Sequence, residues 1–255
     1  MTTELSPAQI ERYSRQILLR EIGGGGQVRL LQGRVVVLGA GGLGSAAAFY
    51  LAAAGVGHLI IADQDRVELS NLQRQILHTT DRIGHAKTAS AARTIASLNP
   101  EIQVTPFPHR VDERTVDALL HQGDLVVDGS DTFATRQLLN AACLRAGKPL
   151  ISAAVLGFEG QLASFRHGVD PAAPCYRCLY PHPPQPGQTA NCRTAGVLGA
   201  LTGMLGAWQA AEAVKELLGI GDSLAGSLLL FNLLQGEVQR IRIVKNPECP
   251  VCAPR

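Results

Sequence analysis

The feature that most constrains the fold is a glycine-rich turn, GAGGLG, at residues 39–44. It follows the apolar segment RVVVLG and opens an alanine-rich helix expected to run from Gly42 to Gly55. Glycines at this spacing allow a tight strand-to-helix turn and let backbone N–H groups approach a phosphate. A second apolar strand, HLIIAD, ends at Asp63, where an acid that binds a ribose belongs. The unit predicts a strand–helix–strand fold that binds a nucleotide; the alternative is a glycine-rich turn without a ligand.

Short apolar strands continue to alternate with helices as far as residue 153, which is typical of a parallel sheet covered on both faces. Before the first strand, Ser6 and Pro7 start a helix that should run to about Glu21 and end at the glycine cluster, residues 23–26. Further strands are expected at IQVTPF, DLVVDGS and PLISA, and further helices at His85–Leu98, Asp112–His121 and Thr132–Ala146.

The pattern changes after residue 153 to a strand–turn–strand, a long helix rich in small residues that ends near Leu218, and a final hairpin. We therefore expect an α/β fold: a Rossmann-like, doubly wound and mostly parallel sheet extended by C-terminal antiparallel strands. Residues 1–255 are expected to form a single domain, with a nucleotide-binding half at 1–153 and a second half at 154–255.

Composition excludes several classes of protein. Lys and Arg number 23 against 21 Asp and Glu, a net charge of only +2, and aromatic residues are 4%. This balance argues against a dedicated binder of nucleic acid or of a membrane surface. The uncharged stretch from Val35 to Ala62 is interrupted by glycines, so a buried strand–helix–strand unit explains it better than a membrane span. The polar N-terminus lacks the features of a signal peptide, so we expect a cytoplasmic protein.

Four of the six cysteines form two matched pairs, Cys175-x-x-Cys178 and Cys249-x-x-Cys252. Four thiolates in paired turns predict a structural Cys₄ zinc site, against the alternative of two unrelated redox pairs. Cys143 lies in an apolar helical stretch and is expected in the core. Cys192 precedes Arg193 and a helix start, which both favour a thiolate, so it is either a nucleophile or an inert loop cysteine.

A polar block, Ser70-Asn71-Leu72-Gln73-Arg74-Gln75, and Lys87 suit an enzyme that splits ATP better than one that transfers hydride. Cations are needed to stabilise charge that develops on a triphosphate, although an ordinary solvated surface is the alternative. Asp131 follows the strand DLVVDGS, where one carboxylate suits Mg²⁺ bound to phosphates; it can equally be the N-cap of the next helix.

The chain closely resembles the ThiF/MoeB (HesA/MoeB/ThiF) family, bacterial relatives of ubiquitin-activating enzymes that adenylate sulfur-carrier proteins. The match runs from about Glu11 to Cys252 and rests on these segments: RYSRQILL, GAGGLGSAAAFYLAAAGVG, SNLQRQILH, DGSDTFATR, CYRC, NCRTAGV and CPVC. The resemblance implies adenylation, with ATP and Mg²⁺, of the C-terminal glycine of a ubiquitin-fold carrier, which makes 154–255 the carrier-binding and zinc half.

The family's residues carry over by motif. The resemblance implies catalytic roles for Arg74, Lys87, Asp131 and Cys192, and for Arg15 acting on the ATP of a neighbouring subunit, hence a homodimer. The nucleotide is expected to contact Gly39, Gly41, Gly42, Gly44, Asp63, Asp65, Ser70, Asn71, Gln73, Arg74, Lys87, Asp131 and Thr132. The zinc ligands are Cys175, Cys178, Cys249 and Cys252.

Within the family, NCRTAGV, RYSRQILL and LISAAVLGFEGQL look more like ThiF than MoeB. That resemblance favours thiamine thiazole synthesis on a ThiS-like carrier, with Cys192 where ThiF-type proteins carry the cysteine that links to the carrier. Because the sequence ends at Arg255 without a sulfurtransferase domain, a separate sulfur donor such as a cysteine desulfurase is expected.

Other functions stay open on the sequence alone. A MoeB-like enzyme would serve a MoaD-like carrier for molybdopterin synthesis, and one enzyme can serve both carriers. More distant alternatives are a nucleotide-dependent oxidoreductase, a non-catalytic zinc-stapled scaffold, and the related dehydratases that modify tRNA.

Overall fold

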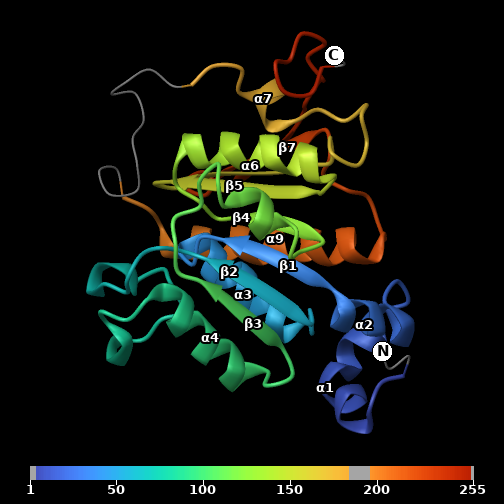
Figure 1. Cartoon of the computed structure of the whole chain (residues 1–255), viewed down its shortest axis with the longest axis vertical. Coiled ribbons are helices and arrows are strands. Elements are labelled where there is room, and N and C mark those ends of the chain that lie inside the picture. The colour runs from blue at the N-terminus through green and yellow to red at the C-terminus, as the bar shows by residue number, and fades with distance from the viewer. Residues whose placement is uncertain (1–3, 184–195, 254–255) are drawn as a thin grey trace.

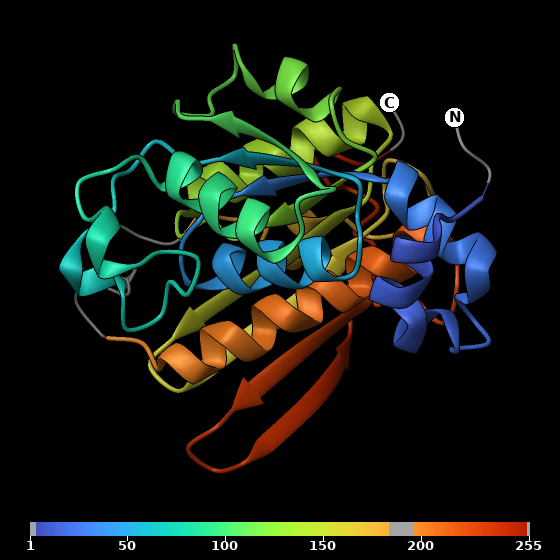
Figure 2. The same ribbon diagram turned by 90° about the horizontal axis from the view of Figure 1, so that it is seen from below.

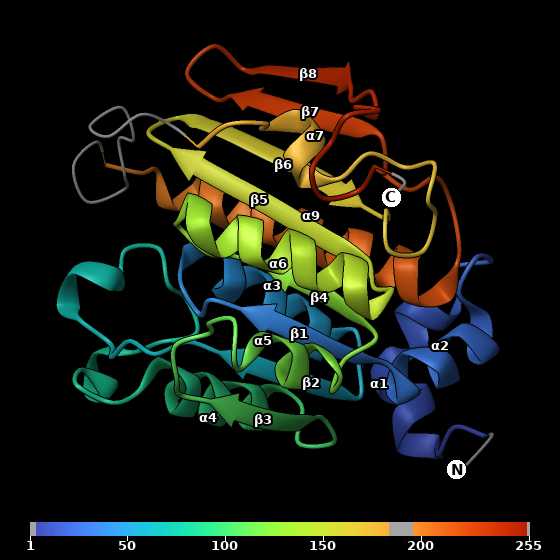
Figure 3. The ribbon, with the colours of Figure 1, turned by 45° about the horizontal axis from the view of Figure 1, so that its top comes forward.

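The computed structural model describes residues 4–183 and 196–253 and contains one eight-stranded sheet in the order β3-β2-β1-β4-β5-β6-β7-β8 (Figure 3). The first five strands in chain order are parallel to one another, and the last three are antiparallel to their neighbours. The expected α/β class, with a mostly parallel sheet extended by antiparallel strands, is confirmed. The strands are β1 (Arg34–Leu38), β2 (His58–Ala62), β3 (Gln103–Phe107), β4 (Leu125–Asp128), β5 (Leu150–Leu156), β6 (Glu159–Phe165), β7 (Ser227–Asn232) and β8 (Glu237–Arg242).

Helices cover both faces of the sheet (Figures 1 and 2). Helices α2, α3, α4 and α9 pack on one face, and α5, α6 and α7 on the other. None of the helices in the described parts of the chain is long and apolar enough to span a membrane. The helices are α1 (Pro7–Ile17), α2 (Gly23–Gln32), α3 (Gly42–Ala53), α4 (Lys87–Leu98), α5 (Val116–Leu120), α6 (Phe133–Ala146), α7 (Tyr176–Leu179) and α9 (Gly199–Leu218), with short 3₁₀ turns η1 (Leu69–Asn71) and η2 (Thr80–Arg82).

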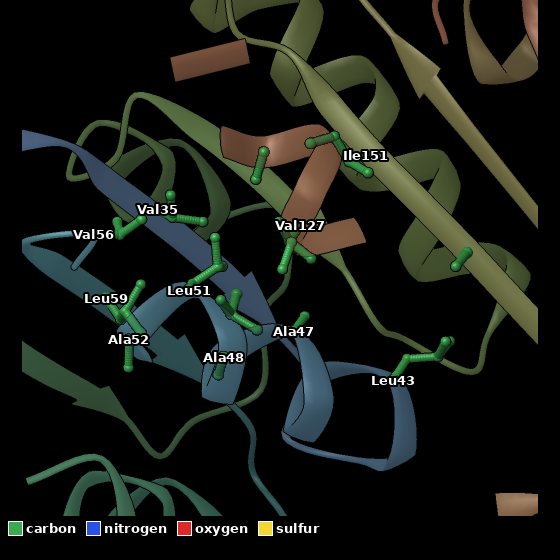
Figure 4. Packing of buried hydrophobic residues seen from close by; sticks show 14 of the residues in the cluster. Val35, Leu43, Ala47, Ala48, Leu51, Ala52, Val56, Leu59, Val127 and Ile151 are labelled. Atoms are coloured by element: carbon green, nitrogen blue, oxygen red, sulfur yellow. The ribbon is translucent and has the colours of Figure 1, made fainter. Parts of the chain in front are cut away.

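The central strands are buried on both faces, which explains their uninterrupted apolar sequences. In β1, Val35 and Val37 belong to the cluster under α3 and α9, whereas Val36 belongs to the cluster under α5 and α6. Figure 4 shows the first cluster, in which Leu51 of α3 lies over the sheet between residues of β1 and β2. A strand that must fill both layers carries no polar residue at alternate positions.

The small residues expected in the long C-terminal helix let α9 lie directly against α3. A Cβ atom on Gly206 of α9 would lie 2.3 Å from the carbonyl oxygen of Leu43, so only glycine permits this approach. Near the start of α3, a Cβ on Gly42 would lie 2.8 Å from Thr202 Oγ1. The start of α3, where the glycine turn ends, is therefore packed so closely against α9 that Gly42 has no room for a side chain.

The N-terminal region differs from the single helix expected up to Glu21. Helix α1 ends at Ile17, and the glycine cluster, residues 23–26, forms the first turn of a second helix rather than a terminator. Glycine is a weak helix former, but tertiary contacts override propensity here. The buried side chain of Gln27 donates to the carbonyl of Ala54 and accepts from Gln16, which anchors α2 to both α1 and α3.

Helix α5 is shorter than the expected Asp112–His121. The Asp112 carboxylate accepts the N–H groups of Arg114 and Thr115 in a turn that precedes the helix. The acid therefore stabilises a turn before the helix and is not its N-cap residue.

The sheet has two open edges, β3 and β8. Every residue of β8 is exposed, and among the described residues this strand pairs with β7 alone. Strand β3 carries Pro106, a residue that sheets tolerate at their edges because it has no N–H to donate.

Candidate active site

The candidate site lies where β1 adjoins both β2 and β4. From β1 the chain proceeds through β2 to β3 on one side, and returns to β4 and β5 on the other. Loops after strands on opposite sides of such a switch point leave a crevice at the carboxyl ends of the strands, which is where open α/β sheets bind ligands.

The glycines of the turn serve two different purposes. Gly39 has a φ of +89°, and a Cβ on Gly44 would lie 1.7 Å from the Gly39 carbonyl oxygen, so both are required for the turn to close. Gly41, by contrast, has ordinary extended angles, and a Cβ there would meet only Gln75 Nε2, at 3.9 Å. The open space over Gly41, at the N-terminus of α3, suits a phosphate group.

Asp63, directly after β2, holds the loops together. Its Oδ2 accepts the Ala40 N–H at 2.8 Å and its Oδ1 accepts the Asp65 N–H at 2.8 Å. Burial raises the pKa of Asp63, and nearby Lys87 partly opposes this shift. Asp63 therefore joins the glycine turn to the loop after β2 at the carboxyl ends of these strands. Its role toward a ribose stays a prediction.

The polar block and Lys87 approach the glycine turn from α4 and the loop before it. Lys87, the first residue of α4, is buried, and its Nζ lies 3.0 Å from Asp65 Oδ2. Arg74 is partly buried, and its Nη1 donates to the carbonyl of Ser70 at 3.1 Å. A buried ammonium group at a helix N-terminus is unfavourable without an anion nearby, which a nucleotide phosphate would supply in addition to Asp65.

The other predicted residues of the block shape its backbone. Asn71 is buried and its Oδ1 accepts the Glu68 N–H at 3.2 Å, whereas Ser70 is exposed. A Cβ on Gly199, the first residue of α9, would lie 2.5 Å from the carbonyl oxygen of Gln73. The block is therefore packed between the glycine turn and α9.

Asp131 and Thr132 follow β4 at the same end of the sheet. The N-cap of α6 is Thr132, whose side chain accepts the Thr135 N–H, so the alternative role of Asp131 as this N-cap is wrong. Asp131 is exposed and has no hydrogen bond or ion pair within residues 4–183 and 196–253. A free carboxylate beside the crevice fits a hard cation such as Mg²⁺.

Two predicted residues are not part of this cluster. Arg15 lies on α1, whose Tyr13 and Gln16 contact Asn99 and Ala54 at the C-terminal ends of α4 and α3, at the opposite end of the strands from the crevice. Within one chain Arg15 therefore does not reach the crevice. Cys192 lies outside the described residues.

Sequence reasoning named Gln75 only as a member of the polar block and did not name His78; both lie beside the glycine turn. Gln75 is 4% exposed and its Oε1 is buried without a hydrogen-bond partner in the described parts of the chain. An unpaired buried amide is costly, and a missing ligand or water is one explanation. Both residues belong to the block SNLQRQILH. Their place in that block was the only feature of the sequence that could have indicated a position near the glycine turn.

Asp128 and Arg136 were also not singled out. Asp128 is fully buried, accepts from Ser152 Oγ at 2.7 Å and from the Ser130 N–H at 2.9 Å, and lies 3.7 Å from Arg136 Nε. Arg136 Nη2 donates to the carbonyl of Ser130 at 2.6 Å. These contacts fix the loop that presents Asp131.

The four paired cysteines converge beside α6, where Asn140 Nδ2 lies 3.6 Å from Cys175 Sγ. Cys143, which lies apart from them, is buried in the core as predicted. Sγ distances are 3.6 Å for Cys175–Cys249, 3.9 Å for Cys175–Cys178 and 3.4 Å for Cys178–Cys252. A tetrahedral zinc with Zn–S bonds of ~2.3 Å requires sulfurs about 3.8 Å apart. The cluster therefore fits a structural metal with no position left for a substrate.

The glycine turn gives a sharp test of the crevice. Gly41→Ala is expected to keep the melting temperature, because the added methyl meets open space at ordinary backbone angles, but to weaken ATP binding about tenfold or more. Gly44→Ala should instead destabilise the fold by about 3 kcal/mol or more, because the methyl collides with Gly39. Thermal melts and calorimetric titration with ATP measure both effects. Wild-type ATP affinity in Gly41→Ala would place the phosphates elsewhere.

Comparison with known proteins agrees with this geometry. The SAMP-activating enzyme E1 of Haloferax volcanii is 48% identical over 252 residues, which are 99% of this chain and 92% of that protein. The sulfur carrier protein adenylyltransferase of Thermus thermophilus is 46% identical over 246 residues, 96% of this chain and 91% of that protein. The crystal structure of E. coli MccB has the same fold: its TM-score is 0.82 at 23% identity, covering 96% of this chain and 72% of that one.

Residues 13–251 match the model of a protein family described as the ThiF family. The match covers almost the whole chain and includes the glycine turn, the polar block and all but the last cysteine of the metal cluster. The expected enzyme class, an adenylyltransferase, is confirmed by these relatives, whereas the narrower assignment to the ThiF rather than the MoeB branch stays a prediction. The chain belongs to the ThiF family.

Proposed function

We propose that the protein uses ATP to adenylate the C-terminal glycine of a ubiquitin-fold sulfur-carrier protein. A carboxylate oxygen of the carrier attacks the α-phosphorus, the bond from that phosphorus to pyrophosphate breaks, and acyl adenylate and pyrophosphate result. The observation that carries the proposal is that the open glycine turn, Asp63 and Lys87 lie together at the carboxyl ends of β1 and β2: Asp63 accepts the Ala40 N–H, and Lys87 pairs with Asp65. The names of the two relatives support the choice of substrate.

Each group at the crevice has a role that its chemistry suits. The N–H groups at the start of α3 bind phosphate, Asp63 accepts from the ribose hydroxyls, and Arg74 and Lys87 stabilise charge on the departing pyrophosphate. Mg²⁺ held by Asp131 would supply further positive charge to the triphosphate. Zn²⁺ held by Cys175, Cys178, Cys249 and Cys252 has a structural role.

The position of Arg15 supports the homodimer that is part of the proposal. Because α1 packs at the amino end of the strands, Arg15 can serve a crevice only on a second copy of the chain. Its side chain is exposed and makes no ion pair within the described residues, so it is free to do so.

The pathway is the finer part of the proposal. We favour a ThiS-like carrier and thiamine thiazole synthesis in the cytoplasm, with sulfur from a separate donor such as a cysteine desulfurase. Cys192, beside Arg193, would then form the covalent link that divides sulfur transfer into two easier displacements. The alternative is a MoeB-like enzyme that only adenylates a MoaD-like carrier.

The test is carrier-dependent ATP–pyrophosphate exchange with ThiS-like and MoaD-like proteins measured side by side. Exchange with the ThiS-like carrier alone supports the thiamine pathway, and exchange with the MoaD-like carrier alone supports the alternative. No exchange with either carrier, although ATP binds, would contradict the proposed function.

Cys192→Ser separates adenylation from sulfur transfer. Because an acyl adenylate forms without a protein thiol, the variant is expected to retain exchange but to lose thiocarboxylate formation when a cysteine desulfurase supplies sulfur. Mass spectrometry of the carrier measures the product. Thiocarboxylate at the wild-type rate would make Cys192 a bystander and favour the MoeB-like function.

A further inference from the structure

A buried histidine, His78, connects the glycine turn to α4. Its side chain is 5% exposed, its Nε2 lies 2.9 Å from the carbonyl oxygen of Ala40, and its Nδ1 lies 3.0 Å from Ser90 Oγ. One partner belongs to the turn between β1 and α3, and the other to the helix that begins with Lys87. The imidazole therefore joins two separate parts of the crevice.

The two partners fix which ring nitrogen carries the proton. A carbonyl oxygen can only accept, so Nε2 is the donor to Ala40, and a neutral ring then accepts at Nδ1 from the Ser90 hydroxyl. Burial lowers the pKa of His78; the hydrogen bond to Ala40 opposes this shift, and Lys87 and Arg82 add to it, so the net direction agrees with a neutral ring.

Hydrogen bonds fix the orientation of the two peptide groups on either side of the Ala40 Cα atom. Its N–H donates to Asp63 Oδ2 at 2.8 Å, and its carbonyl accepts from His78 and also from Ser45 Oγ at 3.2 Å. Since C=O and N–H point in opposite directions across a trans peptide, a carbonyl turned into the protein directs the Gly41 N–H outward. That N–H has no acceptor in the described parts of the chain. The same residue also has open space around the position that a Cβ atom would take, where the nearest described atom is Gln75 Nε2 at 3.9 Å.

We propose that His78 is a positioning residue that aims the Gly41 N–H at a phosphate of the bound nucleotide. The inference rests on the proposed function, since it takes ATP as the ligand of the crevice. Ser90 holds the imidazole ring against α4. Because Lys87 is on the same helix, the position of its ammonium group and the orientation of the Gly41 N–H are then fixed together. Preorganised donors need no rearrangement when charge develops, and a misplacement of about 1 Å can cost ~10²-fold in rate.

Two substitutions distinguish the donor to Ala40 from the contact with Ser90. In His78→Gln the side-chain amide nitrogen can reach the position of Nε2, whereas in His78→Asn the shorter amide can replace only Nδ1. His121→Asn is the matched control, because His121 is exposed at the end of α5 on the opposite face of the sheet. For each variant we would measure the melting temperature, the affinities for ATP and for adenosine by calorimetry, and kcat and KM in pyrophosphate exchange.

His78→Asn is expected to lower kcat about 100-fold and to weaken ATP binding about tenfold, with adenosine affinity unchanged. His78→Gln should recover most of both losses, and His121→Asn should match the wild type. Equal losses for ATP and adenosine in both variants, with a lower melting temperature, would reduce His78 to a structural residue. Wild-type behaviour of His78→Asn would also overturn the proposal.

The binding measurements keep this inference separate from the proposed function. If the wild-type protein binds ATP but shows no exchange with any carrier, the proposed function fails. The comparison of ATP with adenosine still tests His78 in that case.

Discussion

Arg74→Ala is expected to lower carrier-dependent ATP–pyrophosphate exchange by about 10²–10³-fold, the effect of removing one preorganised group that stabilises developing charge. The guanidinium makes one hydrogen bond in the described structure, to the carbonyl of Ser70 at 3.1 Å, so its other N–H groups are available to a phosphate. Isotope exchange between pyrophosphate and ATP, at saturating carrier, measures the loss.

Two further variants show whether the effect is specific. Arg93→Ala removes an exposed arginine on α4 and controls for the change in net charge. Arg74→Lys keeps the positive charge but loses the planar guanidinium group, so its rate of pyrophosphate exchange should lie between those of the wild type and Arg74→Ala. Exchange within a few-fold of the wild type in Arg74→Ala would exclude Arg74 from the catalytic machinery.

Cys249→Ser is expected to lower the free energy of unfolding by about 3–5 kcal/mol, through loss of a metal that holds together two distant parts of the chain. For a chain of this size that corresponds to ~10 °C or more in melting temperature. Metal analysis of the wild type should find one zinc per chain, and the variant should retain little. Burial raises the pKa of the Cys175 thiol to about 11, so a nearby cation would favour the thiolate form of this residue.

Cys143→Ala is the matched control because it removes a buried thiol from outside the cluster. It should keep the zinc even if it loses some stability. Because a Cys₄ site has no open position, folded protein without zinc should still adenylate its carrier. A metal-free wild type, or exchange that stops on zinc removal while the fold persists, would contradict a structural role.

The strands were predictable because a strand buried on both faces must be apolar throughout, and short runs such as RVVVLG and DLVVDGS show this directly. Their order in the sheet is a different matter, since it depends on long-range pairing that local sequence does not contain. The N-terminal region shows the same limit: the glycine cluster at 23–26 forms a helix because Gln27 is bonded to distant residues, not because of its own propensity.

For the site, the sequence predicted which loops meet, because carboxyl ends of parallel strands lie at one edge. It did not predict the contacts that orient those loops. His78 and Gln75 are ordinary residue types in a polar block, and only the fold places them over Ala40 and Gly41. Arg15 is the opposite case: its motif implied a role at the nucleotide, and the structure shows that a single chain cannot bring it there.

The two open edges of the sheet affect the tendency of the protein to aggregate. An unpaired edge accepts further strands, which is a route to aggregation. On β3 this is opposed by Pro106, and on β8 by Glu237, Arg240 and Arg242, which must lose hydration when a strand is added. Without its two arginines β8 would keep a single charged residue, Glu237, beside the β-branched Val238 and Ile241, a composition closer to that of segments that form stacked sheets. Those side chains therefore oppose aggregation by strand addition at the edges of the sheet.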